Sequence, residues 1–385
     1  MDNLTHTLFG FTLSRTSLER AGRGTTAALL LASNAPDLDI VEVLHGGRLA
    51  YLAGHRDITH GLAAVVPLAA ITATAVWGWQ RWQQRRRRGS PAQAPRPGAR
   101  PDASFLALLG VSVIGVLGHV LMDLCTSYGT RLLSPFHQTW YAFDFLPIID
   151  IYLWAILLAA TLACALRPAQ RRRIATTALA LTAGWYGLRA TAHQAARNEA
   201  IAQETAQGLV ACTPAARGPA PWLDLVSWPG RAAPKLDAPA TSGAAPSSCV
   251  VQTAALPTFL SPFEWRIVQR FPDAYALTDI NVLDDWLPAA ADGGIRQSLR
   301  YPDSHAPAVR EAAAAPPARI LLDFARFPAA RVFTTGGRTE VSWIDVRFAG
   351  GITSLTARRP ADDTFRATVV VDPAGRVLNS RLGGD

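Results

Sequence analysis

The sequence contains only four cysteines among its 385 residues, and it lacks the early basic region that opens a cleavable signal peptide. Asp2 and His6 stand where that region would lie. Long apolar runs are missing beyond about residue 190, where Pro, Asp, Arg and Thr become more frequent; Ala, Leu, Ile, Val and Trp dominate the first half. This shift predicts two units of ordinary size. We expect an α-helical membrane domain over residues 1–192 and a small β-rich soluble domain over residues 193–385.

Acidic residues are outnumbered, with 29 Asp and Glu against 37 Lys and Arg and a net charge of +8. Much of the basic excess lies in two clusters, Arg85–Arg88 and Arg171–Arg173, each directly after an apolar run. Clusters in this position are typical of the cytoplasmic loops of membrane proteins. Nucleic acid is a weaker interpretation, because neither a base-reading motif nor interleaved aromatic residues accompany the clusters. The expected partner is therefore membrane lipid, and no nucleic acid is expected.

Four apolar segments have the composition of membrane spans, which need about 20 residues to cross a hydrocarbon core of about 30 Å. They are Gly61–Trp79, Ser104–Met122, Ile149–Leu166 and the shorter Ile174–Leu188. Two more apolar segments, Leu4–Leu13 and Thr25–Ala35, are too short to span, and they predict half-helices or short helices buried inside the bundle. Residues 80–103 are basic and rich in proline, so we expect a cytoplasmic linker there.

Placing both arginine clusters in the cytoplasm fixes the direction of every span. The first span then runs inward, the second outward, the third inward and the fourth outward, so the soluble domain is expected in the periplasm. Cys212 and Cys249 are the only cysteines of this domain. An oxidising compartment predicts a disulfide between them, with two buried free thiols as the alternative.

The second half alternates apolar and β-branched runs with turn residues, which is the pattern of a β-rich domain. The runs are Cys249–Thr253, Glu264–Arg270, Arg319–Asp323, Val341–Phe348 and Phe365–Val371. Turn signals stand at Thr335–Gly337 and Asp372–Gly375.

Ionisable side chains gather in the apolar half, where they are costly and usually functional. Five of the eight histidines precede residue 120, and several aspartates accompany them. The predicted topology brings residues from four separate segments to the periplasmic ends of those segments. These residues are Asp37, Asp39, His55, His60, His119 and Asp123, and His6 joins them if the first short helix descends from that face. Chance would scatter such residues over both faces, so the set as a whole favours a metal site.

Each motif alone also has an ordinary structural explanation. His119 and Asp123 lie one helical turn apart, a spacing that suits a metal but also a hydrogen bond on a helix surface. The segment Asn34–Asp39 has the residues of a helix cap and turn. His55–His60 could be a polar loop at the membrane interface, and His6 could be a core histidine with satisfied hydrogen bonds. The metal interpretation depends on their combination.

The order and spacing of these motifs resemble those of the bacterial membrane-bound metal-dependent hydrolases, also known as the YdjM or DUF457 family. The matching segments are Asn3–His6, Asn34–Asp39, His55–Arg56, Thr59–Gly61, Gly118–Asp123 and Thr126–Thr130, with Asp144 and Asp150 on either side of Phe145–Pro147. The resemblance covers about residues 1–190, and Gly61 departs from it because a serine is common there. Pro262–Arg266 and Asp345–Arg347 are similar to a C-terminal extension found in some members. The resemblance implies a multi-pass protein of the bacterial inner membrane with a metal site.

A looser resemblance to zinc-dependent phospholipase C bears on mechanism. It implies that His60, His119 and Asp123 bind one zinc ion and that His6 and Asp123 share a second. It also implies that Asp37 orients or deprotonates the attacking water. Mixed imidazole and carboxylate donors suit zinc, with manganese or iron as alternatives.

The candidate site therefore has three groups of residues. The expected metal ligands are His6, Asp37, His60, His119 and Asp123. The expected catalytic or substrate-contacting residues are Asp37, His55 and Arg56, where Arg56 is either a bidentate phosphate ligand or an anchor at headgroup level. The residues expected around them are Asn34, Asp39, Ser127, Asp144 and Asp150.

The predicted function is a metal-dependent hydrolase, phosphoesterase-like or phospholipase-like, that acts on a lipid or lipid-linked (phospho)ester at the periplasmic face. The alternative is a non-enzymatic inner-membrane protein in which the metal is structural and the periplasmic domain binds a partner. A transporter is disfavoured, because no internal repeat is present.

Overall fold

The computed structural model describes residues 1–88, 100–212, 221–230, 233–237, 249–283, 298–349 and 365–383. The chain divides into two compact units. Unit 1 contains Met1–Val41, Gly54–His137 and Ile148–Gly187, and unit 2 contains Glu42–Ala53, Gln138–Pro147 and Leu188–Asp385. The boundary expected at residues 192 and 193 falls inside a helix that continues to Ala206. Of the expected linker, residues 80–88 are helical and residues 89–99 lie outside the described part of the chain.

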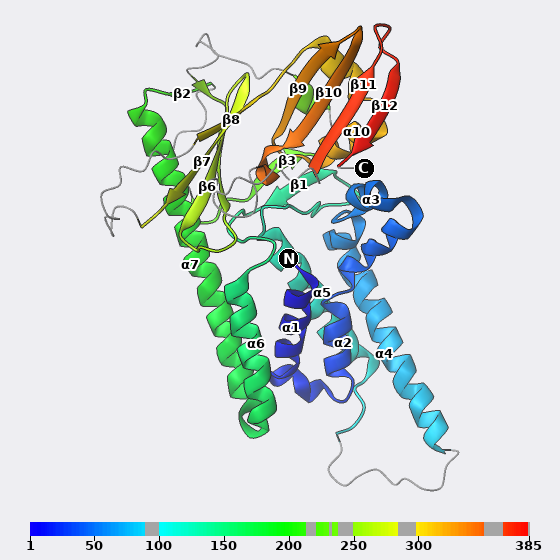
Figure 1. Cartoon of the computed structure of the whole chain (residues 1–385). Helices are drawn as coiled ribbons and strands as arrows, with labels where there is room; N and C mark the ends of the chain where they lie inside the picture. The colour runs from blue at the N-terminus through cyan, green and yellow to red at the C-terminus, as the bar shows by residue number, and fades with distance from the viewer. Residues whose placement is uncertain are drawn as a thin grey trace. The chain divides into compact units, whose positions relative to one another are not determined.

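Unit 1 is built from helices (Figure 1). Their bounds are α1 Asn3–Ser14, α2 Thr25–Ala32, α4 Val65–Arg88, α5 Phe105–Leu124, α6 Ile151–Leu166 and the first part of α7 Arg171–Ala206. Short 3₁₀ helices connect them: η1 Ser17–Ala21, η2 Pro36–Glu42, η3 Ile58–His60, η4 Leu62–Ala64 and η5 Pro168–Gln170. The remaining helix, α3 Val43–Gly54, falls mostly in unit 2.

Two helices among the described residues are long and apolar enough to cross a membrane, Leu62–Arg86 and Phe105–Leu124. The pair α6 and α7 is a third candidate, with a bend of 118° at the break between the two helices. The helical region thus has two or three candidate spans, and the expected count of four is not confirmed. The third expected span, α6, has only 16 residues, which rise about 24 Å, and the fourth lies within α7, which is not among the helices that qualify by themselves.

Close packing of α2 against α5 sets the position of the residues that form the candidate site. Leu29 of α2 and Leu108 of α5 are fully buried in one apolar cluster that also includes Val76 of α4. Gly115 allows α2 to approach, because a Cβ atom at this position would lie 2.8 Å from the Cβ of Ala32. The two short apolar segments of the N-terminal region are therefore helices packed within the bundle.

Unit 2 is dominated by two four-stranded antiparallel sheets. The first has the order β5 Gln252–Pro257, β6 Glu264–Arg270, β7 Ala274–Asn281, β8 Ser298–Pro302, and the second has the order β12 Val377–Leu382, β11 Arg366–Val371, β10 Arg338–Asp345, β9 Pro328–Thr335. Two smaller pairs are β1 Thr139–Ala142 with β3 Val226–Pro229 and β2 Val210–Ala211 with β4 Cys249–Val250. The helices are α8 Ala233–Leu236, α9 Pro307–Ala312 and α10 Pro316–Phe324, with the 3₁₀ helix η7 Val346–Phe348. Both large sheets contribute to one apolar core, which includes Val268, Leu277 and Ile344.

The prediction of a β-rich domain is confirmed, with one error in its elements. Arg319–Asp323, expected as a strand, lies in helix α10. Two prolines open this helix, where the fixed φ of proline suits the first turn. Its buried residues Ala318, Leu321 and Leu322 recur at a spacing of three and four, which places them on one helical face.

Both turn signals of the second half form turns. Thr335 and Arg338 pair across a hairpin whose two loop residues, Gly336 and Gly337, have φ of +58° and +77°. These angles suit a type I′ turn, which glycine adopts without strain. In the second turn, the Asp372 side chain accepts hydrogen bonds from the backbone of Ala374 and Arg376.

The predicted disulfide is present. Cys212 and Cys249 are bonded, with their Cα atoms 4.9 Å apart, in the range usual for disulfides. The bond joins the segments of β2 and β4, which pair in parallel over two residues. The disulfide closes a loop formed by the residues between the two cysteines, and the structure describes only part of this loop.

Candidate metal centre

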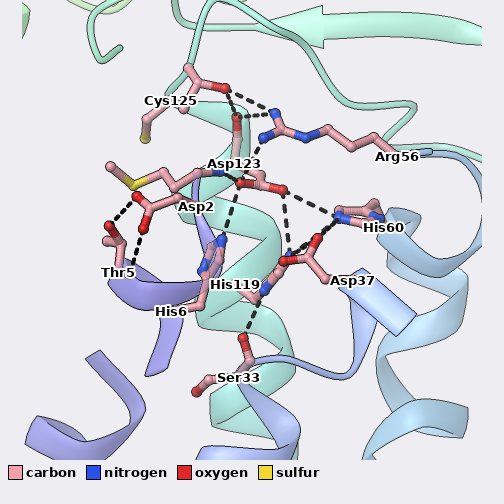
Figure 2. Close-up of polar contacts among 12 residues, drawn as sticks. Asp2, Thr5, His6, Ser33, Asp37, Arg56, His60, His119, Asp123 and Cys125 are labelled. Atoms are coloured by element: carbon pink, nitrogen blue, oxygen red, sulfur yellow. Dashed lines mark hydrogen bonds and ion pairs between the residues drawn. The ribbon is translucent and has the colours of Figure 1, made fainter. Parts of the chain in front are cut away.

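Four side chains from three elements converge in unit 1. Asp37 comes from η2, His60 from η3, and His119 and Asp123 from the last turns of α5. All four are buried, and one donor atom from each lies within 4.8 Å of the others (Figure 2). These are four of the five expected metal ligands, and we call them the inner group.

The donor separations of the inner group match a tetrahedral ion. His60 Nε2 lies 3.2 Å from His119 Nε2, 3.3 Å from Asp37 Oδ1 and 3.3 Å from Asp123 Oδ2. His119 Nε2 lies 3.6 Å from Asp37 Oδ1 and 3.4 Å from Asp123 Oδ2. Donors placed about 2.0–2.1 Å from a tetrahedral zinc ion are about 3.3–3.4 Å apart. Five donor–donor separations therefore have the length that such an ion requires.

The hydrogen bonding of the inner group also fits a cation. Within the described residues, Asp37 Oδ2 and Asp123 Oδ2 are buried without a hydrogen-bond partner. Buried carboxylate oxygens without donors are costly unless a cation compensates them. The Nε2 atoms of His60 and His119 face each other at 3.2 Å, an arrangement that a shared metal ion would also accommodate. The residues present thus suit a divalent ion.

Each histidine of the inner group is held in its orientation by contacts to its second ring nitrogen, Nδ1. His119 Nδ1 donates to the carbonyl oxygen of Ser33 at 2.8 Å, which leaves the lone pair on Nε2. His60 Nδ1 lies 3.0 Å from Thr59 Oγ1 and 3.5 Å from Asp39 Oδ2. Partners of this kind fix the tautomer and the ring orientation of metal-binding histidines. Burial lowers the pKa of His60 well below its usual range, which favours the neutral ring that a metal binds.

Arg56 is buried behind Asp123. Its Nη2 lies 3.1 Å from Asp123 Oδ1, while Nη1 donates to Thr126 Oγ1 at 2.9 Å and to the Gly129 carbonyl at 3.3 Å. The guanidinium stacks over the Tyr128 ring at 4.6 Å. Arg56 has a φ of +59°, a left-handed conformation that a non-glycine residue adopts rarely. These contacts differ from the expected phosphate contact, because they use the side chain to hold a carboxylate of the centre.

His6 lies beside the inner group. Its ring stacks on the His119 ring with centroids 3.6 Å apart, and its Nε2 is 3.4 Å from Asp123 Oδ1. That oxygen also contacts the Arg56 guanidinium (Figure 2) and the amino group of Met1. His6 therefore shares Asp123 with two cationic groups, and it is not one of the four clustered donors.

A second group adjoins the first and shares Asp37 with it. Donor atoms of Asp37, Asp39 and His55 all lie within 4.8 Å of one another, and we call these three residues the outer group. His55 Nδ1 lies 3.1 Å from Asp39 Oδ2. Asp39 also accepts hydrogen bonds from the Arg56 backbone and the Thr59 hydroxyl. Asp39, expected only around the site, thus stands among potential ligands.

The whole region containing these residues matches a known family. Residues 1–196 match the family model described as YdjM inner membrane protein. The chain belongs to the YdjM inner membrane protein family. The matched segment contains every residue of the inner and outer groups, and the family confirms the predicted membrane character of this half. A curated relative of this YdjM-family chain is the uncharacterized protein YfhP of Bacillus subtilis (strain 168), which is 26% identical over 168 residues.

That alignment covers 42% of this chain and 45% of YfhP, so the chain matches less than half of the relative's length. No solved structure matches the chain significantly. The resemblance to zinc-dependent phospholipase C stays a prediction.

Three of the residues expected around the centre have other partners in the structure. Asn34 joins α1 to α2, because it accepts from Thr7 and donates to the Leu30 carbonyl. Asp150 caps α6 by accepting from the backbone of its first turn, and it accepts from the Trp185 indole. Asp144 belongs to unit 2, where its carboxylate pairs with Arg326. Ser127 lies half-buried directly after Thr126, in the segment that contacts Arg56.

Sequence reasoning missed the contributions of Ser33 and Thr59. Ser33 acts through its backbone carbonyl, which any residue offers, so no residue type signals it. Thr59 stands inside a segment matching the family, but its hydroxyl role requires knowledge of the His60 ring orientation.

Proposed function

We propose that this YdjM-family protein is a membrane-embedded metal-dependent hydrolase that acts on a lipid or lipid-linked (phospho)ester at the periplasmic face of the inner membrane. The observation that carries the proposal is the inner group, whose donor separations suit a tetrahedral divalent ion. Its mixed imidazole and carboxylate donors favour zinc, with manganese or iron as alternatives.

A divalent ion in this centre would lower the pKa of a coordinated water to about 7 and polarise a phosphoryl or acyl oxygen of the substrate. The chain's own residues prepare that environment. The Ser33 carbonyl and Asp39 fix the two histidine rings, and Arg56 holds the Asp123 carboxylate. His60, His119 and Asp123 have no exposed surface, so bulk water is excluded and electrostatic interactions at the centre are strong.

A lipid substrate is supported by the surface of η2. Asp37 and Asp39 are 8% and 5% exposed, whereas Leu38, Ile40 and Val41 of the same short helix are 61%, 55% and 49% exposed. One face of this helix thus supplies carboxylates to the centre, and the other presents large apolar side chains outward. Exposed apolar residues grouped in this way typically meet lipid or an apolar ligand. A substrate that resides in the membrane suits both the carboxylate face and the apolar face of η2.

Ion pairs gather basic residues at one end of unit 1. Glu19 pairs with Arg100 at 2.7 Å and with Arg171 at 2.6 Å, and Asp102 pairs with Arg23 at 3.4 Å. These pairs join the connection between α1 and α2, the segment before α5, and the first turn of α7. Figure 1 shows the lower end of α4 and the turn between α6 and α7 at this same end of the unit.

The metal centre lies at the other end of α5. This helix starts directly after the ion-paired segment, and its 20 residues rise about 30 Å to the turn that carries His119 and Asp123. The positive-inside rule assigns the basic end to the cytoplasm, so the centre faces the periplasm. The disulfide of unit 2 supports a periplasmic location for that unit, because such bonds persist in oxidising compartments.

The test is hydrolysis of membrane lipid by the purified full chain. Vesicles of phosphatidylethanolamine and phosphatidylglycerol are incubated with protein loaded with zinc, and released headgroup phosphate and fatty acid are measured. We expect release that falls to background in His119→Ala and Asp123→Ala. His137→Ala, which removes an exposed histidine outside both groups, should keep full activity.

Undiminished hydrolysis in both ligand variants would overturn the proposal. Bound zinc without hydrolysis of any phosphoester or carboxylic ester lipid would favour the alternative, in which the metal is structural and unit 2 binds a partner.

A further inference from the structure

We propose that the centre holds two divalent ions, that Asp37 bridges them, and that the outer group of Asp37, Asp39 and His55 is the substrate-facing site. The assignment of substrate contact rests on the proposed hydrolase function, whereas the number of ions does not. The inner group then has a supporting role beside the outer one.

Asp37 has the contacts expected of a bridging carboxylate. Its Oδ1 faces the inner group, at 3.3 Å from His60 Nε2 and 3.6 Å from His119 Nε2. Its Oδ2 is buried and has no hydrogen-bond partner among the described residues. The residue also belongs to the cluster with Asp39 and His55, whose donor atoms lie within 4.8 Å of one another. One carboxylate with one engaged oxygen and one unpartnered oxygen can serve both groups.

The two groups differ in how many coordination positions they leave open. The inner group supplies four protein donors, which complete a tetrahedral shell, and His60, His119 and Asp123 are fully buried. The outer group supplies three donors, and its His55 side chain is 12% exposed. Structural zinc sites typically have four protein ligands, whereas catalytic sites have three and an open position. The outer group therefore has the ligand number and the solvent access of a catalytic zinc site.

The alternative place for a second ion, between His6 and Asp123, is electrostatically poor. The Asp123 oxygen nearest His6 already contacts the Arg56 guanidinium at 3.1 Å. A divalent cation there would lie within a few ångströms of a buried positive charge. Asp39 of the outer group accepts a hydrogen bond from the Arg56 backbone N–H at 3.2 Å, which stabilises the carboxylate.

The charge of the centre also fits two ions and an anionic substrate. Asp37, Asp39 and Asp123 supply three negative charges, and Arg56 and the Met1 amino group supply two positive charges. One divalent ion brings this set to +1, and two bring it to +3. A positive, partly enclosed site attracts a phosphoester anion.

Metal content decides the number of ions. The full chain is purified in detergent, loaded with zinc, dialysed and measured by mass spectrometry for zinc per chain. We expect two ions in the wild type and in the control His137→Ala, and one ion in His55→Ala and Asp39→Asn. If Asp39→Asn fails to fold, His55→Gln provides a second outer variant that keeps a polar side chain.

The rate at which metal ions are lost distinguishes the inner group from the outer group without an activity assay. On addition of a soluble chelator, the wild type should lose one ion quickly and the other slowly, because the outer group is open and the inner group is buried. His55→Ala should lack the fast phase. One ion per wild-type chain, unchanged in His55→Ala and lost in His119→Ala, would overturn the two-ion inference and leave the hydrolase proposal standing. No bound zinc in the wild type would overturn both.

Discussion

His119 Nδ1 lies 2.8 Å from the carbonyl oxygen of Ser33, so the end of α2 orients a metal-ligand ring on α5. Gly115, one turn before His119, makes this approach possible, since a Cβ atom there would lie 3.3 Å from the Ser33 nitrogen and 2.8 Å from the Ala32 Cβ. Helix packing and ligand orientation are therefore coupled at one glycine.

Substituting Gly115 by alanine should weaken zinc binding without touching a ligand. The added methyl group pushes α2 from α5 and lengthens the bond to Ser33, and the loss of such a partner typically reduces metal affinity about 10–100-fold. Zinc titration of the purified variant measures the change. Gly110→Ala is the matched control, because its Cβ would meet nothing within 4 Å in the same helix. Equal zinc affinity in the two variants would contradict this coupling.

Arg56→Lys should lower both metal content and turnover. Lysine keeps the charge, but it cannot reach Asp123, Thr126 and Gly129 at once as the guanidinium fork does. The Asp123 carboxylate then loses its fixed position, so bound zinc and kcat fall together. A direct phosphate contact, one of the two roles expected from the sequence, predicts instead a raised KM with unchanged zinc. Arg172→Lys, at an exposed position on α7, is the control for replacing an arginine by lysine.

The inner group could be predicted because residue type and helical spacing carry most of its information. His119 and Asp123 lie four residues apart on one helix, and Asp37 and His60 stand in short polar segments next to apolar ones. Asp144 and Asp150 have equally suggestive neighbours along the chain, yet one pairs with Arg326 in unit 2 and the other caps α6. Which carboxylate reaches the centre depends on tertiary packing.

The outer group was only partly predictable. His55 was expected near the substrate, but Asp39 was expected as a supporting residue, because sequence spacing does not show which oxygen of Asp37 faces which neighbour. The error at Arg319–Asp323 has a different cause. A short apolar run is compatible with a strand or a buried helix, and here the two prolines before it favour the helix.

Breaking the disulfide should destabilise unit 2. Cys212 and Cys249 are separated by 37 residues, for which chain entropy in the unfolded state corresponds to about 3 to 4 kcal/mol. Cys212→Ser should therefore lower the free energy of unfolding of unit 2 by about this amount, measured by denaturant titration. Cys164→Ser, which removes a free cysteine, should have a much smaller effect. Two alkylated thiols at these positions in unreduced, denatured wild type would contradict the pairing.

Reporter fusions test the orientation of the chain. A fusion after Arg88 or after Arg173 should report the cytoplasm, because both follow arginine clusters. A fusion after Asp237 should report the periplasm, since α7 starts at the basic end and leads to unit 2. A cytoplasmic signal after Asp237 would invert the topology and place the metal centre on the inner face.

Removal and return of the metal test the central claim most directly. Lipid hydrolysis by the wild-type chain is measured as purified, after exhaustive chelation, and after zinc, manganese or ferrous ion is added back to the chelated protein. We predict that chelation abolishes hydrolysis and that at least one of these ions restores it in the wild type but not in His119→Ala. Hydrolysis that survives complete removal of bound metal would contradict a metal-dependent hydrolase.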